Sequence, residues 1–132
     1  MKSMIRAASG LGVLLALVSS ATSARAHHSF TPVFDMNRRI TIAGTLVKVD
    51  WRNPHIHLDV EAHEPGGTPK VWNVEAMPPT YFAARGITKT DFEHAVGQTI
   101  TVDIMGAKDG SASGLMQKIT FPDGRVIAWQ GS

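Results

Sequence analysis

Histidine is the residue type in this chain that is best suited to chemistry. His55 and His57 stand two positions apart in a segment where apolar and polar residues alternate, and Asp59 continues the same series. Residues at this spacing in a β-strand project from one face, about 7 Å apart. Imidazole binds copper, zinc, iron and nickel, and a neighbouring carboxylate serves as a further ligand or as an acceptor for the other ring nitrogen. The pattern favours a metal site, and its alternative is a solvated face of an amphipathic strand.

His27 and His28 form a second histidine pair, close to the start of the chain. If export removes the residues up to Ala26, His27 becomes the amino terminus, and its free amine and ring nitrogen can chelate one ion together. This arrangement resembles the copper brace of some exported copper proteins. The candidates for a further ligand are His28, His55 and His57, and copper is the metal that we expect there. The alternative is that residues after a cleavage site are unconstrained and bind nothing.

Residues 1–26 have the pattern of a secretory signal peptide. Lys2 and Arg6 give a positive start, residues 7–18 are uncharged, and Ala24-Arg25-Ala26 ends the segment with small residues around one arginine. Cleavage after Ala26 leaves 106 of the 132 residues, and none of the later segments is apolar enough to span a bilayer. We therefore expect a periplasmic protein without a stable membrane span, the alternative being an uncleaved anchor.

Composition limits the classes of function. The predicted leader holds three of the 13 basic residues and none of the 11 acidic ones, so the mature net charge is −1. A nearly neutral domain lacks the electrostatic footprint of a nucleic-acid binder. The chain has no cysteine, which excludes disulfides, thiolate metal sites and cysteine nucleophiles. Its length and its 43% of hydrophobic residues indicate one globular domain.

The Trp51-Arg52-Asn53-Pro54-His55 corner is a further candidate site. Asn-Pro interrupts the strand pattern, and residues 106–114 form another predicted loop, rich in glycine. In an OB-like barrel, loops at these places follow the first and the fourth strand and flank the ligand face. We expect one groove, for a small ligand or a periplasmic protein, rimmed by these residues: Trp51, Asn53, His55, Lys108 and Asp109. The alternative is simple turn chemistry, with the tryptophan in the core.

Motifs of well-known enzyme classes are absent from the sequence. There is no G-x-S-x-G, no phosphate-binding loop and no dinucleotide fingerprint, and the strand carboxylates show no readable acid–base pairing. A metal-dependent enzyme built on the same histidines would need an open coordination position and a substrate pocket. We therefore expect a binding module with no catalytic residue first, and a copper-binding protein second.

The elements that must position these residues indicate a small β-domain. Strands are predicted over residues 39–51, 55–62, 71–76, 98–104, 115–121 and 125–129. Between the third and the fourth, Pro78-Pro79 begins a short helix that Gly86 ends, and Thr88 with Asp91 predicts a capping box for a second helix. The expected class is all-β with a short helical insert. We predict a small five- to six-stranded OB-like barrel over residues 39–132 after an arm of residues 27–38, with a small β-sandwich as the alternative.

The first strand is predicted to bend. Ile40 and Ile42 share one face, but past Gly44 the apolar residues have the other parity: Val47, Val49 and Trp51. A shift of one residue at a glycine predicts a β-bulge at Gly44.

Several short motifs together resemble a known family. They are HHSF at 27–30, FD at 34–35, G-T-L-V-x-V-x-W-x-N-P-H at 44–55, W-x-V-E at 72–75, G-I-T at 86–88 and A-K-D-G-S at 107–111. The set resembles the domain of unknown function 6152 family of small exported bacterial proteins, over residues 27 to about 126. The resemblance implies an exported single domain without an established activity. It also implies that HHSF and W-R-N-P-H are the stretches in which to seek function.

Overall fold

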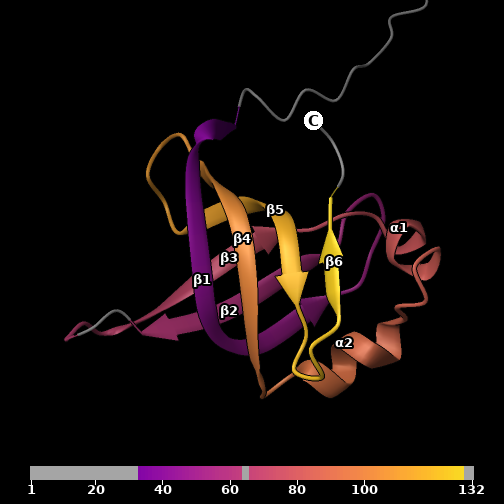
Figure 1. The fold of residues 1–132 in the computed structure, drawn as a ribbon. Coiled ribbons are helices and arrows are strands. Elements are labelled where there is room, and N and C mark those ends of the chain that lie inside the picture. Colours follow the sequence, from indigo (N-terminus) through magenta and orange to yellow (C-terminus); the bar gives the residue numbers. More distant parts are fainter. Residues whose placement is uncertain (1–32, 64–65, 130–132) are drawn as a thin grey trace, which may run out of the picture.

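The computed structural model describes residues 33–63 and 66–129, which form six strands and two short helices (Figure 1). In chain order the elements are β1 (Phe34–Asp50), β2 (His57–His63), β3 (Pro69–Glu75), α1 (Pro79–Ala83), α2 (Lys89–Ala95), β4 (Thr99–Ala107), β5 (Ser113–Thr120) and β6 (Val126–Ala128). The predicted all-β class, with a helical insert between the third and fourth strands, is confirmed.

Five of the strands form a closed ring. The sheet has the order β3-β2-β1-β4-β5-β6, and an additional pairing of β3 with β5 closes it. Neighbouring strands are antiparallel except β3 and β5, which are parallel. The ring and the position of the helices match the predicted OB-like arrangement. All six strands belong to one sheet, so the described ranges do not form the alternative two-sheet sandwich.

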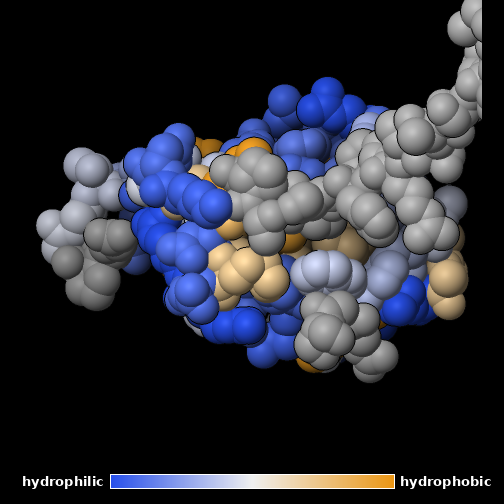
Figure 2. Space-filling model, turned by 90° about the horizontal axis from the view of Figure 1, so that it is seen from above, coloured by the Kyte–Doolittle hydropathy of each residue, from blue (hydrophilic) through white to orange (hydrophobic). Residues whose placement is uncertain are grey.

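The inward side chains of the ring form one apolar core. Strand alternation buries Leu58 and Val60 of β2 completely, and the helices add an aromatic cluster near one end of the ring. In this cluster Phe92 lies edge-on to both Phe82 and Phe121, with ring centroids 5.0 Å apart in each pair. In the part of the chain that the structure describes, no polar or charged side chain is buried. A functional site there must therefore use surface side chains, and Figure 2 shows a mostly hydrophilic surface in the view from above.

β1 bends at a different position from the one predicted. The irregular pairing with β2 lies between Leu46 and Lys48, and not at Gly44. Leu46 is fully buried whereas Val47 is 42% exposed, so the apolar phase changes after Leu46. Gly44 has another function, because a Cβ atom there would lie 2.3 Å from the carbonyl oxygen of Glu61. The glycine permits the close approach of β1 to β2, and the bulge two residues later turns the strand.

The remaining boundaries show where local patterns were insufficient. β1 already begins at Phe34, although residues 27–38 were expected to form an arm, because Phe34 pairs with Ala107 of β4 and is buried. β4 and β5 extend into the predicted 106–114 loop and leave only residues 108–112 between them. The capping box of α2 is confirmed, since the side chains of Thr88 and Asp91 each accept a hydrogen bond from the other residue's backbone N–H.

Candidate functional site

The outer surface of β1, β2 and β3 carries aligned rows of polar side chains. In the observed register, Asp50 of β1 pairs with His57 of β2, which pairs with Glu75 of β3. The next row toward the β2–β3 hairpin consists of Lys48, Asp59 and Asn73. Because alternate residues of a strand share a face, and β2 buries Leu58 and Val60, the polar residues of both rows face outward together.

His57 and its neighbours form a short chain of hydrogen bonds. The side-chain nitrogen of Asn73 donates a hydrogen bond to Oδ1 of Asp59 at 2.8 Å. The side-chain oxygen of Asn73 lies 3.3 Å from Nδ1 of His57. Both interactions run from β3 to β2, so they hold the side chains of two strands in one arrangement. The imidazole of His57 therefore has a defined orientation on the surface of the sheet.

His55 lies on the same face of the sheet, two residues before the start of β2. Backbone hydrogen bonds of Ile56 with Met77 and Ala76 continue the pairing with the segment after β3. They place Ile56 in the core, and His55 faces outward with its Nδ1 2.5 Å from Oε1 of Glu75. The two side chains are 21% and 23% exposed, so solvent screens this pair only in part.

A hollow of about 300 Å³ lies on this surface. We call it the outer-face hollow, and its lining residues are Lys48, Asp50, Arg52, His57, Asp59 and Asn73. Arg52 forms an ion pair with Asp50, with its Nε 3.2 Å from the Asp50 carboxylate. The lining thus combines two cations, two carboxylates, one imidazole and one amide, which is a set for hydrogen bonding to a small polar molecule.

The structure does not bring the expected corner and loop together into one groove. Figure 1 shows the β1–β2 connection beside α1 at one side and the β4–β5 loop at the opposite upper side. Trp51 packs against Phe92 of α2, with ring centroids 5.5 Å apart, and Asn53 is exposed. The separation follows from the long, bent β1, because the corner follows its carboxyl end whereas the β4–β5 loop follows Ala107, the partner of Phe34 at its amino end.

The two predicted residues of the β4–β5 loop have local roles. The backbone N–H of Lys108 donates to the carbonyl of Val33, and Asp109 accepts a hydrogen bond from the backbone N–H of Ser111. Hydrogen bonds from Ser111 hold the pKa of Asp109 below its ordinary value. Both side chains are exposed, and neither lines the outer-face hollow.

Of the four histidines predicted to bind a metal, the structure describes two. His55 and His57 lie on one face as expected, but within residues 33–63 and 66–129 no group of three or more His, Asp or Glu side chains is arranged to hold an ion. His27 and His28 lie outside the described residues. The copper site built on His27 therefore stays a prediction.

Sequence reasoning did not single out Lys48, Asp50 or Asn73, and it included Arg52 only as a member of the Trp51–His55 corner. Lys48 and Asp50 alternate along the end of β1, Arg52 continues this series just beyond the strand, and Asn73 stands between the apolar residues Trp72 and Val74. This parity indicated that the four side chains face outward. Which of them lie beside His57 depends on the register of three strands, which the local pattern does not specify.

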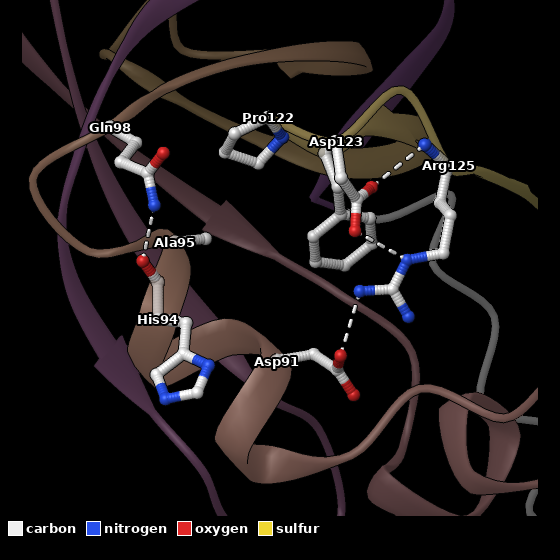
Figure 3. Close-up of a pocket in the computed structure, with 8 residues that line it drawn as sticks. Asp91, His94, Ala95, Gln98, Pro122, Asp123 and Arg125 are labelled. Carbon is white, nitrogen blue, oxygen red and sulfur yellow. Dashed lines mark hydrogen bonds and ion pairs between the residues drawn. The ribbon is translucent and has the colours of Figure 1, made fainter.

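A second hollow, of about 270 Å³, lies between α2 and the β5–β6 turn (Figure 3). There the Arg125 guanidinium bonds Asp91 of α2 and Asp123 of the turn, each at 2.7 Å. Hydrogen bonds from Thr88 and Arg125 lower the pKa of Asp91, and the two carboxylates raise the pKa of Arg125. The charged groups satisfy one another, so this cluster fastens the turn to α2 and is a weaker candidate for ligand binding.

In the described part of the structure no helix is long and apolar enough to cross a membrane.

Comparisons with known proteins place the chain in a family. Curated proteins and solved structures give no match. A family model described as "Family of unknown function (DUF6152)" matches residues 15–117, a range that includes every residue of the outer-face hollow. The match covers well over half of the 132 residues, so the chain belongs to this family of unknown function.

Proposed function

We propose that this protein is a non-catalytic binding module of the periplasm, and that it holds a small polar molecule in the outer-face hollow. The observation that carries the proposal is the hydrogen-bonded series His57–Asn73–Asp59, which lines the hollow and crosses two strands. Side chains oriented before binding lose less conformational entropy when a ligand arrives. A face built on paired strands also holds its groups more precisely than a loop does.

The size and lining of the hollow favour a small ligand over a protein partner. About 300 Å³ is at the lower end of ligand pockets, and every lining residue is polar. A stable protein interface buries about 800 Å² per partner and has an apolar or aromatic centre. Lys48 and Arg52 supply donors, and Asp50 and Asp59 supply acceptors, so the ligand classes that fit are sugars, amino acids and hydroxy acids.

Spectroscopy on the mature protein tests this function. We expect millimolar additions from the three ligand classes to shift the amide NMR signals around Lys48, His57 and Asn73 for at least one class. Lys48→Ala should weaken that binding, whereas Lys89→Ala should not, because Lys89 lies on α2 and pairs with Glu93. Absence of shifts for all three classes, or shifts confined to another surface, would contradict the proposal.

The periplasmic part of the proposal has its own test. The charged start, the apolar run and the Ala24-Arg25-Ala26 ending support export and cleavage. Mass spectrometry of protein from a periplasmic extract should give the mass of residues 27–132. Detection of the uncut chain, or recovery only with the cytoplasm, would contradict it.

A further inference from the structure

The side-chain amide of Asn73 orients two hydrogen-bond acceptors in the outer-face hollow. Its nitrogen donates to Oδ1 of Asp59, so its oxygen is the atom that faces Nδ1 of His57. An amide oxygen only accepts hydrogen bonds, so Nδ1 of His57 carries the proton, and in the neutral ring the lone pair is on Nε2. Among the described residues, neither Nε2 of His57 nor Oδ2 of Asp59 has a hydrogen-bonding partner. The hollow therefore presents one imidazole nitrogen and one carboxylate oxygen as acceptors.

Two opposite charges that line the hollow do not contact each other. Lys48 of β1 and Asp59 of β2 are partners in the strand register, and both line the hollow. In the part of the chain that the structure describes, Lys48 makes no ion pair, whereas the other two charged lining residues, Asp50 and Arg52, pair with each other. One ammonium group and one carboxylate are thus left for a bound molecule. A molecule that carries both signs of charge can satisfy both groups at once.

An α-amino acid has the groups that complement this arrangement. Its ammonium group donates up to three hydrogen bonds, and its carboxylate accepts from a lysine. We propose that the outer-face hollow binds a small α-amino acid as its zwitterion, with the ammonium group on Asp59 and on Nε2 of His57, and the carboxylate on Lys48. Asn73 is a positioning residue, because it contacts both acceptors. The inference rests on the proposed function and selects one of the three ligand classes that fit the hollow.

The other two ligand classes fit the same groups less well. A hydroxy acid has a carboxylate for Lys48, but its single hydroxyl donor leaves one of the two acceptors without a hydrogen bond. It also brings an uncompensated negative charge close to Asp59. A neutral sugar supplies donors but has no anionic group for Lys48. The apolar faces of sugar rings pack well on phenyl or indole rings, and none of the lining residues carries one.

A matched pair of small molecules tests the inference, because L-alanine and L-lactate differ only in the ammonium group and the hydroxyl that replaces it. Each is titrated into the mature protein while the amide NMR signals around the outer-face hollow are followed. We expect L-alanine to bind at least about tenfold more tightly, since loss of a charge-assisted hydrogen bond weakens binding by about that factor. N-Acetyl-L-alanine, which lacks the charge on nitrogen, should bind as weakly as L-lactate. Equal or tighter binding of L-lactate would overturn the inference.

A charge variant tests which carboxylate receives the ammonium group. Asp59→Asn should remove the preference for L-alanine over L-lactate, because the amide keeps the size of the side chain and loses its charge. Glu61→Gln is the matched control, since Glu61 stands two positions further along β2 and does not line the hollow. This variant should keep the preference. An undiminished preference in Asp59→Asn, with circular dichroism showing a folded protein in both variants, would contradict the proposed binding mode.

The positioning role of Asn73 has a separate readout. Nitrogen NMR at about pH 8, where an ordinary imidazole is neutral, reports which ring nitrogen of His57 carries the proton. We expect the proton on Nδ1, and we expect Asn73→Leu to shift it toward Nε2 and to weaken L-alanine binding. A proton on Nε2 in the unchanged protein would remove one acceptor and overturn the inference.

The outcomes separate this inference from the proposed function. If L-lactate or D-glucose shifts the signals around the outer-face hollow and L-alanine does not, the proposed function stands and only the amino-acid inference fails. If none of the three molecules shifts these signals, both fail.

Discussion

Replacement of Gly44 by alanine should destabilise the protein by separating β1 from β2. The new Cβ would lie 2.3 Å from the carbonyl oxygen of Glu61, 2.9 Å from its carbon and 3.1 Å from Cα of Ala62. All three are backbone atoms of the paired strand, so no side-chain rotation relieves the contact. Overpacking of this kind costs about 1–3 kcal/mol, and alanine returns about 0.5–1 kcal/mol relative to a strand glycine. The net loss should be about 1 kcal/mol, or about 4–8 °C in Tm for a domain of this size.

Thermal unfolding followed by circular dichroism measures this loss, and urea titration gives the free energy of unfolding independently. Ala43→Ser is the matched control, because Ala43 is the exposed neighbour in β1 and a hydroxyl there reaches solvent. Its unfolding free energy should stay within about 0.5 kcal/mol of the unchanged protein. A Gly44→Ala midpoint within about 2 °C of the unchanged protein would refute the close approach as the reason for this glycine.

Three further predictions concern the core, the corner and the charged cluster. Leu46→Ala should lower the free energy of unfolding, measured by urea titration, by about 2–5 kcal/mol, whereas Val47→Thr should leave it nearly unchanged. A larger loss in Val47→Thr than in Leu46→Ala would contradict the observed phase of β1. Trp51→Ala should lower the unfolding free energy by up to about 3 kcal/mol because it removes the contact with Phe92, and an unchanged value would place this ring outside the packed structure. Because the pKa of Asp91 is lowered from its ordinary 3.8, its stabilising contribution should be present above that pH and be lost as the pH falls through the folded-state pKa. Asp91→Asn should therefore flatten the acid limb of stability against pH, and an identical acid limb in both proteins would contradict the role of the Arg125 cluster.

Local sequence patterns were sufficient for the order and type of the elements. Alternation over residues 55–62 placed His55 and His57 on one face, and Thr88 with Asp91 specified the start of α2. Both results depend on neighbours within four residues, since strand alternation and helix capping are local geometry. The resemblance drawn from short motifs agrees with the family match.

The composition of the candidate site was decided by tertiary structure. The sequence predicted a groove between the Trp51–His55 corner and the β4–β5 loop, but these lie at opposite sides, and the hollow lies on the outer surface of β1 to β3 instead. Lys48 and Asn73 come near His57 only through the pairing of three strands, in the register that β1 and β3 adopt on either side of β2. The bulge after Leu46 changes this register by one residue and so selects which β1 side chains face the histidines. Alternation along one strand determines which face a side chain occupies, but its neighbours on that face come from distant segments, and contacts between those segments form only in the folded chain.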